Sequence, residues 1–399
     1  MTSLSATRGR DIHEQHRAAS PLELLFDLTS VVAVALAAAQ LHHAERTGGV
    51  VGALPGYLLA FFAIWWAWMN FTWFSSAYDD DDATYRLLTL LQMVGALVFA
   101  AGVPALFVGH THLAVAGYVA MRLPLCVQWW RAARGDPERR RTCLRYAGGV
   151  AGVQALWLAQ SLTASSGVLP PSLVWSSVVA LVLLELGVPL WAESCGPPTP
   201  WHAHHIAERY SGFLIIILGE SILSTANAIA GLIEANGLTA ETALVGLGCT
   251  LLTFCLWWMY FLLPSGEALH AHRARSFGWG YGHFATFAAL AAVGSGLGLV
   301  ADVSKQATRS PARALVAVAI PLAIFVASIW VIHRYVTRVA VAPAWLWTLV
   351  LACIALGPWL VAAGLPLRVG LLLLSLGPIV TILHFERERR CRRDASQEP

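Results

Sequence analysis

Long apolar runs separated by short polar loops occupy nearly the whole chain. The runs fall at about 21–42, 53–76, 86–108, 112–131, 146–165, 172–192, 206–230, 240–263, 277–301, 312–333, 343–363 and 366–385. A helix needs about 20 residues to cross a hydrocarbon layer roughly 30 Å thick. The pattern therefore predicts an all-α integral membrane protein with about twelve transmembrane helices.

Composition supports the same class of protein. Of the 399 residues, 57% are hydrophobic and only 12% are charged, whereas soluble domains carry about 25% charged residues. We therefore expect the lipid bilayer as partner and no nucleic acid, because the net charge is only +3. The seven cysteines are scattered without a CxxC pair, which predicts neither a disulfide framework nor a zinc site. No resident cofactor or metal is expected.

Basic residues predict the orientation in the membrane. Arginine collects in the N-terminal tail 1–20, in the loops 131–145, 270–275 and 334–338, and in the C-terminal tail 386–399. Twelve spans place all of these segments on one side, which the positive-inside rule makes cytoplasmic. The prediction is a multi-pass plasma-membrane protein with cytoplasmic N- and C-termini.

Weak internal similarity at a spacing near 190 residues suggests two related halves. Leu181–Gly187 resembles Leu371–Gly377, and the pair Trp65-Trp66 falls at nearly the same offset from Trp257-Trp258. Duplication of six spans would give parallel repeats, an arrangement found in transporters. The predicted organisation is a tail 1–20, a first six-helix half 21–193, a linker 194–205, a second six-helix half 206–385 and a tail 386–399.

Ionisable residues inside the predicted spans are the candidate site residues. An intramembrane charge is costly and by default indicates function, while a neutral, hydrogen-bonded packing residue is the plainer interpretation. Glu23 and Asp27 share one helical face, although both could simply complement the helix dipole. The candidates for binding substrate or protons are Glu23, Asp27, Arg122, Glu185, Glu208, Arg209, Glu220 and His283.

Three motifs resemble one known family. They are the run Pro21–Leu28 (PLELLFDL), the stretch from Glu208-Arg209-Tyr210 to Gly219-Glu220-Ser221, and Tyr281-Gly282-His283. In this order they resemble the bacterial low temperature requirement protein A (LtrA) family, and the resemblance extends over nearly the whole chain. It implies a polytopic membrane protein and no particular molecular activity. The motif residues carried over from it are Glu23, Asp27, Glu208, Arg209, Glu220 and His283.

The favoured functional hypothesis is a proton-coupled transporter of a small or amphiphilic solute. Buried carboxyls at Asp27, Glu185 and Glu220, together with Arg122 and His283, are the components of a proton relay and a counter-ion site. A non-catalytic accessory membrane protein is the plainer alternative.

A membrane-embedded enzyme acting on a lipid or isoprenoid is the second alternative. The loop Asp79-Asp80-Asp81-Asp82 contains an Asp-x-Asp-Asp pattern. In an enzyme, Asp79, Asp81 and Asp82 would be catalytic, either as acids or as ligands of Mg²⁺ on a diphosphate. The histidines at 202, 204 and 205 are expected to be ordinary solvated residues of the linker.

Overall fold

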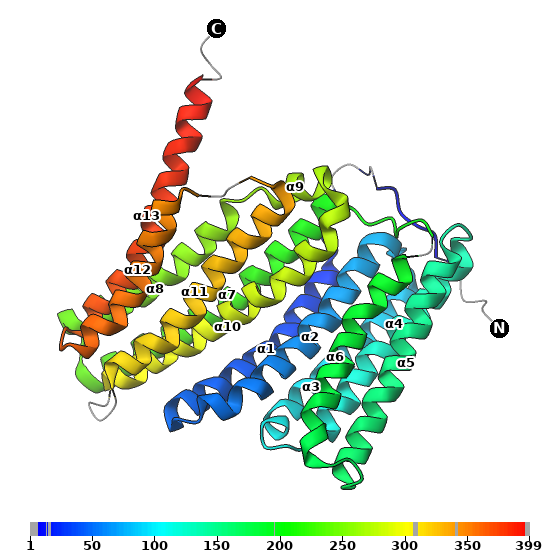
Figure 1. The fold of residues 1–399 in the computed structure, drawn as a ribbon, viewed down its shortest axis with the longest axis horizontal. Helices are drawn as coiled ribbons and strands as arrows, with labels where there is room; N and C mark the ends of the chain where they lie inside the picture. Colours follow the sequence, from blue (N-terminus) through cyan, green and yellow to red (C-terminus); the bar gives the residue numbers. More distant parts are fainter. Residues whose placement is uncertain are drawn as a thin grey trace. The chain divides into compact units, whose positions relative to one another are not determined.

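The computed structural model describes residues 7–12, 14, 17–194, 196–305, 310–339 and 342–395. All regular secondary structure in these residues is helical, and Figure 1 follows the helices in chain order. The helices are α1 (Pro21–Thr47), α2 (Val50–Tyr78), α3 (Ala83–Phe107), α4 (His112–Gly135), α5 (Arg140–Ser165), α6 (Pro171–Glu193), α7 (Ala203–Asn236), α8 (Ala240–Phe261), the short α9 (Ser265–Ala271) and η1 (Arg273–Arg275), α10 (Ser276–Lys305), α11 (Pro311–Thr337), α12 (Ala344–Ala362) and α13 (Leu367–Ala395).

The all-α prediction is confirmed, and each of the twelve predicted apolar runs forms a long helix. By length and composition, ten helices of the described chain can cross a membrane; α4 and α5 are not among them. Their hydropathy is low because they carry polar side chains in mid-helix, such as Arg122 and Gln128 in α4 and Gln154 in α5. All three side chains are buried inside the protein.

The chain forms two compact units. Unit 1 comprises Met1–Ala37 and Pro55–Gly212, and unit 2 comprises Ala38–Leu54 and Phe213–Pro399. The helices α1, α2 and α7 therefore each contribute residues to both units. No repeat is shown among the residues that the structure describes. Trp65 and Trp66 are buried, whereas about half of the surface of Trp257 and Trp258 is exposed.

In unit 1, α3 packs against α4, α4 against α5, and α5 against α6. Glycines allow the first of these contacts, because a Cβ atom at Gly117 would lie 2.2 Å from the backbone nitrogen of Phe99. A Cβ atom at Gly95 or Gly102 would lie 2.4 Å from the backbone of α4. Small residues let membrane helices approach this closely, so α4, which carries Arg122, is held firmly against α3.

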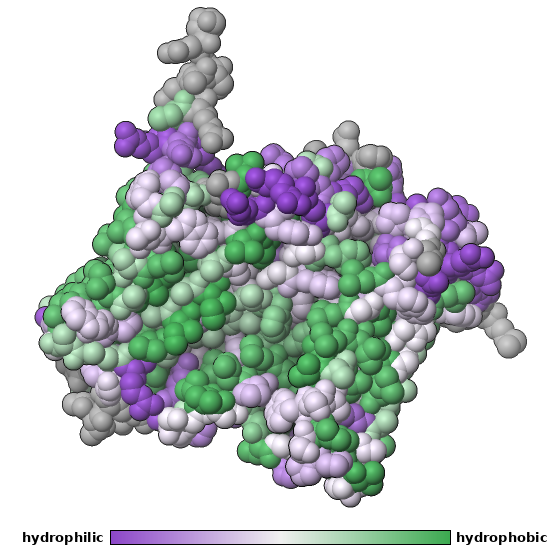
Figure 2. All heavy atoms as spheres, viewed as in Figure 1, coloured by the Kyte–Doolittle hydropathy of each residue, from purple (hydrophilic) through white to green (hydrophobic). Residues whose placement is uncertain are grey.

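In unit 2, α10 packs on α11, α11 on α12, and α13 on both α12 and α8. A Cβ atom at Gly296 of α10 would lie 2.6 Å from the backbone oxygen of Ala317 in α11. Glycine therefore also allows the close contact between these two helices. In both units the outward side chains are largely apolar; examples are Leu183, which is 62% exposed, and Val331, which is 61% exposed. Figure 2 shows apolar residues along the helices and hydrophilic residues gathered near their ends, as expected for helices bathed in lipid.

Candidate functional site

The start of α1 fixes the first candidate carboxylate. Ser20 and Glu23 form a capping box: the Ser20 backbone N–H donates to Glu23 Oε2 at 2.8 Å, and the Glu23 backbone N–H donates to Ser20 Oγ at 3.3 Å. Pro21 occupies the first helical position, where its missing N–H costs nothing. Glu23 is thereby held at 1% exposure, and Asp27 lies one turn further along at 0%.

One face of α2 supplies hydrogen-bond donors to these carboxylates. Trp68, Thr72 and Ser75 follow one another at spacings of four and three residues, which places them on the same helical face. Trp68 Nε1 donates to Asp27 Oδ1 at 2.6 Å, and Ser75 Oγ donates to Glu23 Oε1 at 2.6 Å. Both carboxylates of α1 are therefore oriented by α2.

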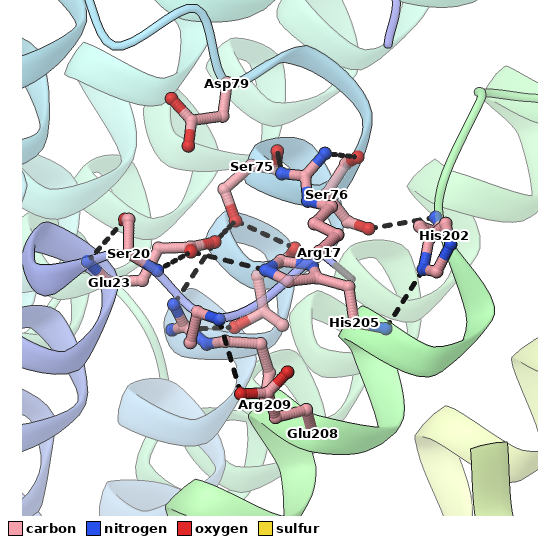
Figure 3. A network of polar contacts seen from close by, with 12 residues as sticks. Arg17, Ser20, Glu23, Ser75, Ser76, Asp79, His202, His205, Glu208 and Arg209 are labelled. Atoms are coloured by element: carbon pink, nitrogen blue, oxygen red, sulfur yellow. Dashed lines mark hydrogen bonds and ion pairs between the residues drawn. The ribbon is translucent and has the colours of Figure 1, made fainter. Parts of the chain in front are cut away.

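The start of α7 brings two basic groups to the same place. Arg209 bridges the two carboxylates: its Nη2 lies 2.5 Å from Asp27 Oδ1, and its Nη1 lies 3.3 Å from Glu23 Oε1. His205, one turn earlier, places Nε2 3.3 Å from Glu23 Oε2. Arg209 is 1% exposed and His205 is 0% exposed. Figure 3 shows Glu23, His205 and Arg209 within this network. We call Glu23, Asp27, His205 and Arg209 the carboxylate cluster.

Only one of the two carboxyl oxygens of Asp27 has hydrogen-bond partners within the carboxylate cluster. Its Oδ1 accepts from both Trp68 and Arg209. Its Oδ2 is buried and has no hydrogen-bond partner in the described part of the chain. Gly212 leaves space on this side, because a Cβ atom there would still lie 3.9 Å from Asp27 Oδ2. One oxygen of a fully buried carboxyl is thus available for a proton.

The opposite face of α2 contributes to a second buried network. Trp66 and Asn70 are one turn apart, and Trp66 is two residues from Trp68, which places it on nearly the opposite side of the helix. Trp66 Nε1 donates to Glu185 Oε2 at 2.9 Å, and Asn70 Oδ1 accepts from Arg122 Nη2 at 3.2 Å. The helix α2 therefore separates two polar networks.

Glu185 of α6 is the centre of this second network. Besides Trp66, it accepts from Gln154 Nε2 at 2.7 Å, from Tyr118 OH at 2.9 Å and from Arg122 Nη2 at 3.3 Å. Glu185 is 0% exposed and Arg122 is 1% exposed. A buried ion pair is tolerated when its remaining lone pairs and protons are hydrogen-bonded. Glu185 meets this condition, whereas Nε and Nη1 of Arg122 have no hydrogen-bond partner in the described part of the chain. We call Trp66, Asn70, Tyr118, Arg122, Gln154 and Glu185 the Glu185 network.

The acidic loop between α2 and α3 makes structural contacts. Asp82 caps α3, since its Oδ1 accepts from the Tyr85 backbone N–H at 2.6 Å. Its other oxygen lies 2.5 Å from Arg131, which is 1% exposed. Asp80 Oδ2 accepts from Thr7 Oγ1 at 2.8 Å and lies 3.5 Å from Arg131. The catalytic or magnesium-binding role expected for this loop in an enzyme stays a prediction.

The other two acids of the loop have opposite environments. Asp81 pairs with Arg86 at 2.6 Å on the surface, and this contact lowers the pKa of the Asp81 carboxyl. Asp79 is 9% exposed and accepts from the Asp81 backbone N–H at 2.9 Å. Burial, and then the nearby charge of Glu23, raise the pKa of Asp79 to about 6.

We expect Asp79 to make stability fall as the pH rises from about 4 to about 6. In that range the folded state holds a proton on Asp79 that the unfolded state has released, so ionisation disfavours folding. Asp79→Asn keeps the acceptor oxygen and should unfold at a higher temperature than wild type at pH 7.5, but at the same temperature at pH 4. Thermal unfolding in detergent at the two pH values measures this difference.

Asp81→Asn is the matched control for that experiment. The residue has φ of 50°, which asparagine accepts readily. Because its pKa is lowered by Arg86, Asp81 contributes stability that is present at neutral pH and is lost in acid. Its substitution should therefore act in the opposite direction, and weakly because the pair is exposed. An Asp79→Asn variant without any pH-dependent gain would show that Asp79 ionises normally.

The structure does not bring the remaining predicted site residues together in one site. Glu208 is exposed and accepts only a long bond, 3.4 Å, from the Ala19 backbone N–H. Glu220 is partly exposed in unit 2, and its carboxyl has no hydrogen bond or ion pair with other described residues. Asp27 and Arg122 belong to the two different networks of unit 1, so they do not share a site.

His283 is buried in unit 2. Its Nδ1 lies 2.8 Å from the backbone oxygen of Trp279, which can only accept. Nδ1 therefore carries the proton, and Nε2 accepts from Tyr260 OH at 3.1 Å. These contacts satisfy a neutral imidazole.

Sequence reasoning misjudged the histidines before α7. His202 and His205 are buried, not solvated; only His204 is exposed. His202 Nδ1 accepts from the His205 backbone N–H at 3.2 Å and so caps the start of α7, while His205 reaches Glu23. The spacing of four residues between His205 and Arg209 could have revealed their shared face.

Two networks of buried charged residues, in a chain whose described part has ten helices long and apolar enough to span a bilayer, define a polytopic α-helical membrane protein with an ionisable interior. The chain belongs to the bacterial low temperature requirement A protein (LtrA) family, which matches residues 18–377. The family resemblance seen in the motifs is thereby confirmed.

One relative has also been found by sequence. The chain is 30% identical over 258 residues to an uncharacterised protein of Rhizobium meliloti (strain 1021). That stretch covers 62% of this chain and 59% of the relative, so the match spans about three fifths of the relative's length.

Proposed function

We propose that this protein is a proton-coupled transporter of a small or amphiphilic solute in the bacterial plasma membrane. The observation that carries the proposal is Asp27, a fully buried carboxyl with one oxygen bound by Trp68 and Arg209 and the other without a partner. Ionisable groups at such positions mark proton and substrate pathways in membrane proteins.

The charges of the carboxylate cluster suggest how binding of a proton is coupled to movement of Arg209 away from Asp27. Within the cluster one guanidinium, Arg209, pairs with both carboxylates, while the buried guanidinium of Arg17 donates to the backbone oxygens of Ser75 and Ser76 beside Glu23. Among the described residues, Arg209 is the charged partner of Asp27. An uncompensated buried charge costs several kcal/mol. When Arg209 withdraws from Asp27, this carboxyl must therefore bind a proton, and when Arg209 returns the proton is released.

The position of the carboxylate cluster suits such a role. It joins the first turns of α1 and α7, and both helices continue from unit 1 into unit 2. Protonation of the cluster therefore acts on two of the helices that the units share. A packing role alone does not require a carboxyl oxygen without a partner at this point, because an unsatisfied buried polar atom costs about 1–3 kcal/mol.

We also infer that all twelve long helices span the membrane, as two six-helix halves with both termini in the cytoplasm. The helix α4, with 24 residues, is about 36 Å long at 1.5 Å per residue. The helix α5, with 26 residues, is longer still, and both exceed a hydrocarbon layer of about 30 Å. Arg122, Gln128 and Gln154 each make a side-chain hydrogen bond inside unit 1, so the low hydropathy of the two helices does not prevent insertion.

The test uses purified protein in sealed liposomes that contain a pH-sensitive dye. Candidate amphiphilic compounds are added outside, and the same samples are analysed for products. We expect a substrate-dependent pH change with chemically unaltered compound. A new product would instead make this protein an enzyme and direct attention to Asp79–Asp82. No pH change with any compound that binds would contradict proton coupling.

A further inference from the structure

A small, partly open cavity of unit 1 is lined by the five helices α2 to α6. Its volume is about 40 Å³, and its lining includes Phe62, Phe99, Tyr118, Trp157 and Val178. Neither the carboxylate cluster nor the acidic loop lines this cavity.

The cavity adjoins the Glu185 network along four helices. Tyr118 belongs to both, since it lines the cavity and donates to Glu185. On α2, Phe62 is one turn from Trp66, and on α5, Trp157 is one turn from Gln154. On α6, Val178 is two turns, about 10 Å, from Glu185. The cavity therefore ends at a buried charged network.

The walls of the cavity favour an apolar occupant over water. A buried water needs roughly 10–15 Å³ and two to four polar partners. The space is sufficient for about three non-hydrogen atoms. Although Thr111 and Gln160 also line it, the surface that the walls expose to the cavity is nearly all apolar. Apolar cavities of this kind stay dry and bind apolar molecules.

One polar group in the lining has no partner of its own. Trp157 is 6% exposed, and its Nε1–H is buried without a hydrogen-bond acceptor in the described part of the chain. A buried donor left unsatisfied costs about 1–3 kcal/mol. A ligand that brings one acceptor oxygen to Trp157 removes this cost, whereas a pure hydrocarbon does not.

The neighbouring ion pair decides the charge of the ligand. Arg122 and Glu185 compensate one another at 3.3 Å, and Glu185 already accepts four hydrogen bonds. A charged ligand would add a third, uncompensated charge to a medium of low dielectric constant, at a cost of several kcal/mol. The ligand is therefore neutral.

We propose that this cavity binds the oxygen-bearing end of a neutral amphiphile dissolved in the bilayer, such as a long-chain or isoprenoid alcohol. If the protein is the transporter proposed above, this is the chemical class of its solute; the substrate assignment rests on that function, but the binding site does not.

The experiment is photolabelling of the purified protein in detergent with a diazirine analogue of 1-octanol, followed by mass spectrometry of the labelled peptides. We expect label on the segments that line the cavity. Unlabelled 1-octanol should compete at a concentration at least tenfold lower than octane, which has no oxygen, or octanoate, which is charged. Equal competition by octanoate would overturn the neutral-ligand assignment.

Two adjacent valines of α6 provide a matched pair of variants. Val178→Phe fills the cavity and should lower the labelling at least tenfold, whereas Val179→Phe, at a position 55% exposed, should leave it unchanged. If Val178→Phe does not fold, Ala63→Val narrows the same cavity with a smaller change. Undiminished labelling in a folded cavity variant would overturn the proposal.

Trp157→Phe tests the hydrogen bond itself. This variant keeps most of the apolar wall and removes the donor, so 1-octanol should lose its advantage over octane as a competitor. A retained advantage would show that another group binds the oxygen. Because these measurements need no proton gradient, failed binding leaves the proton test in liposomes unaffected, and failed proton coupling leaves the binding result intact.

Discussion

Replacing Glu185 with leucine lowers the free energy of unfolding by about 3–5 kcal/mol, the range expected when one partner of a buried ion pair is removed. The variant leaves the Arg122 guanidinium at 1% exposure without its counter-charge. It also leaves three further donors, on Trp66, Tyr118 and Gln154, without their acceptor. Thermal unfolding of the purified variant in detergent measures the loss.

The double variant Arg122→Met/Glu185→Leu shows whether the buried charge causes the loss. Removal of both charges leaves no unpaired ion, and well-packed apolar replacements of buried pairs are often neutral. We therefore expect the double variant to regain the part of the stability that the unpaired Arg122 charge removes, but not the part lost with the acceptor of Trp66, Tyr118 and Gln154. Glu241→Leu is the control, because Glu241 pairs with Arg368 at an exposed position. A single variant as stable as this control would contradict the central role of Glu185.

Replacing Arg209 with methionine is expected to have the second large effect. The guanidinium is the charged partner of both Glu23 and Asp27, and all three side chains are almost fully buried. Without it, Asp27 has no charged partner among the described residues, and Glu23 keeps His205 and the nearby Arg17. We expect a loss of several kcal/mol in unfolding free energy and the complete loss of substrate-dependent pH change in liposomes.

Arg209→Lys separates charge from geometry. Lysine keeps the positive charge, but its single ammonium cannot form the planar two-nitrogen bridge between Glu23 and Asp27. An intermediate stability is therefore expected. Arg86→Met, which removes an exposed arginine paired with Asp81, serves as the surface control and should unfold near the wild-type temperature. If Arg209→Met behaved like this control, the carboxylate cluster would not hold α1 to α7.

The helices were predictable because hydropathy alone reports which segments can be buried in lipid. The runs around 21–42 and 366–385, for example, correspond to α1 and α13. The start of α1 was also readable, because Ser20-Pro21 followed by Glu23 matches a capping box. The sequence pattern did not predict how far α1 and α13 extend beyond these runs. The ends of both helices carry charged residues, which interrupt the apolar pattern.

The pairing of the site residues could be predicted only in part. Glu23 and Asp27 share a face by spacing, but the contact of Asp27 with Arg209 joins residues 182 positions apart. Nothing in the local pattern reports such a contact. The donors Trp68 and Ser75 escaped notice for a different reason: within an apolar run they are read as packing residues, although each donates to a buried carboxylate.

Glu185 and Glu220 show most clearly which features of the site could not be predicted from the sequence. Both residues lie inside long apolar runs, and both were predicted as candidate intramembrane acids. In the structure Glu185 has four donors, whereas Glu220 has no partner among the described residues. The difference lies in Gln154 and Tyr118, polar side chains on other helices whose direction depends on tertiary packing.

Infrared difference spectroscopy of the carboxyl band tests the central claim most directly, because it reports the proton on Asp27 itself. Protein in membranes is exposed to its solute, and the spectra of wild type, Asp27→Asn and the exposed-acid control Glu138→Gln are compared. We predict a solute-dependent change in a protonated-carboxyl band that is absent in Asp27→Asn and unchanged in Glu138→Gln. The same band in Asp27→Asn would contradict the assignment of Asp27 as the proton-exchanging group.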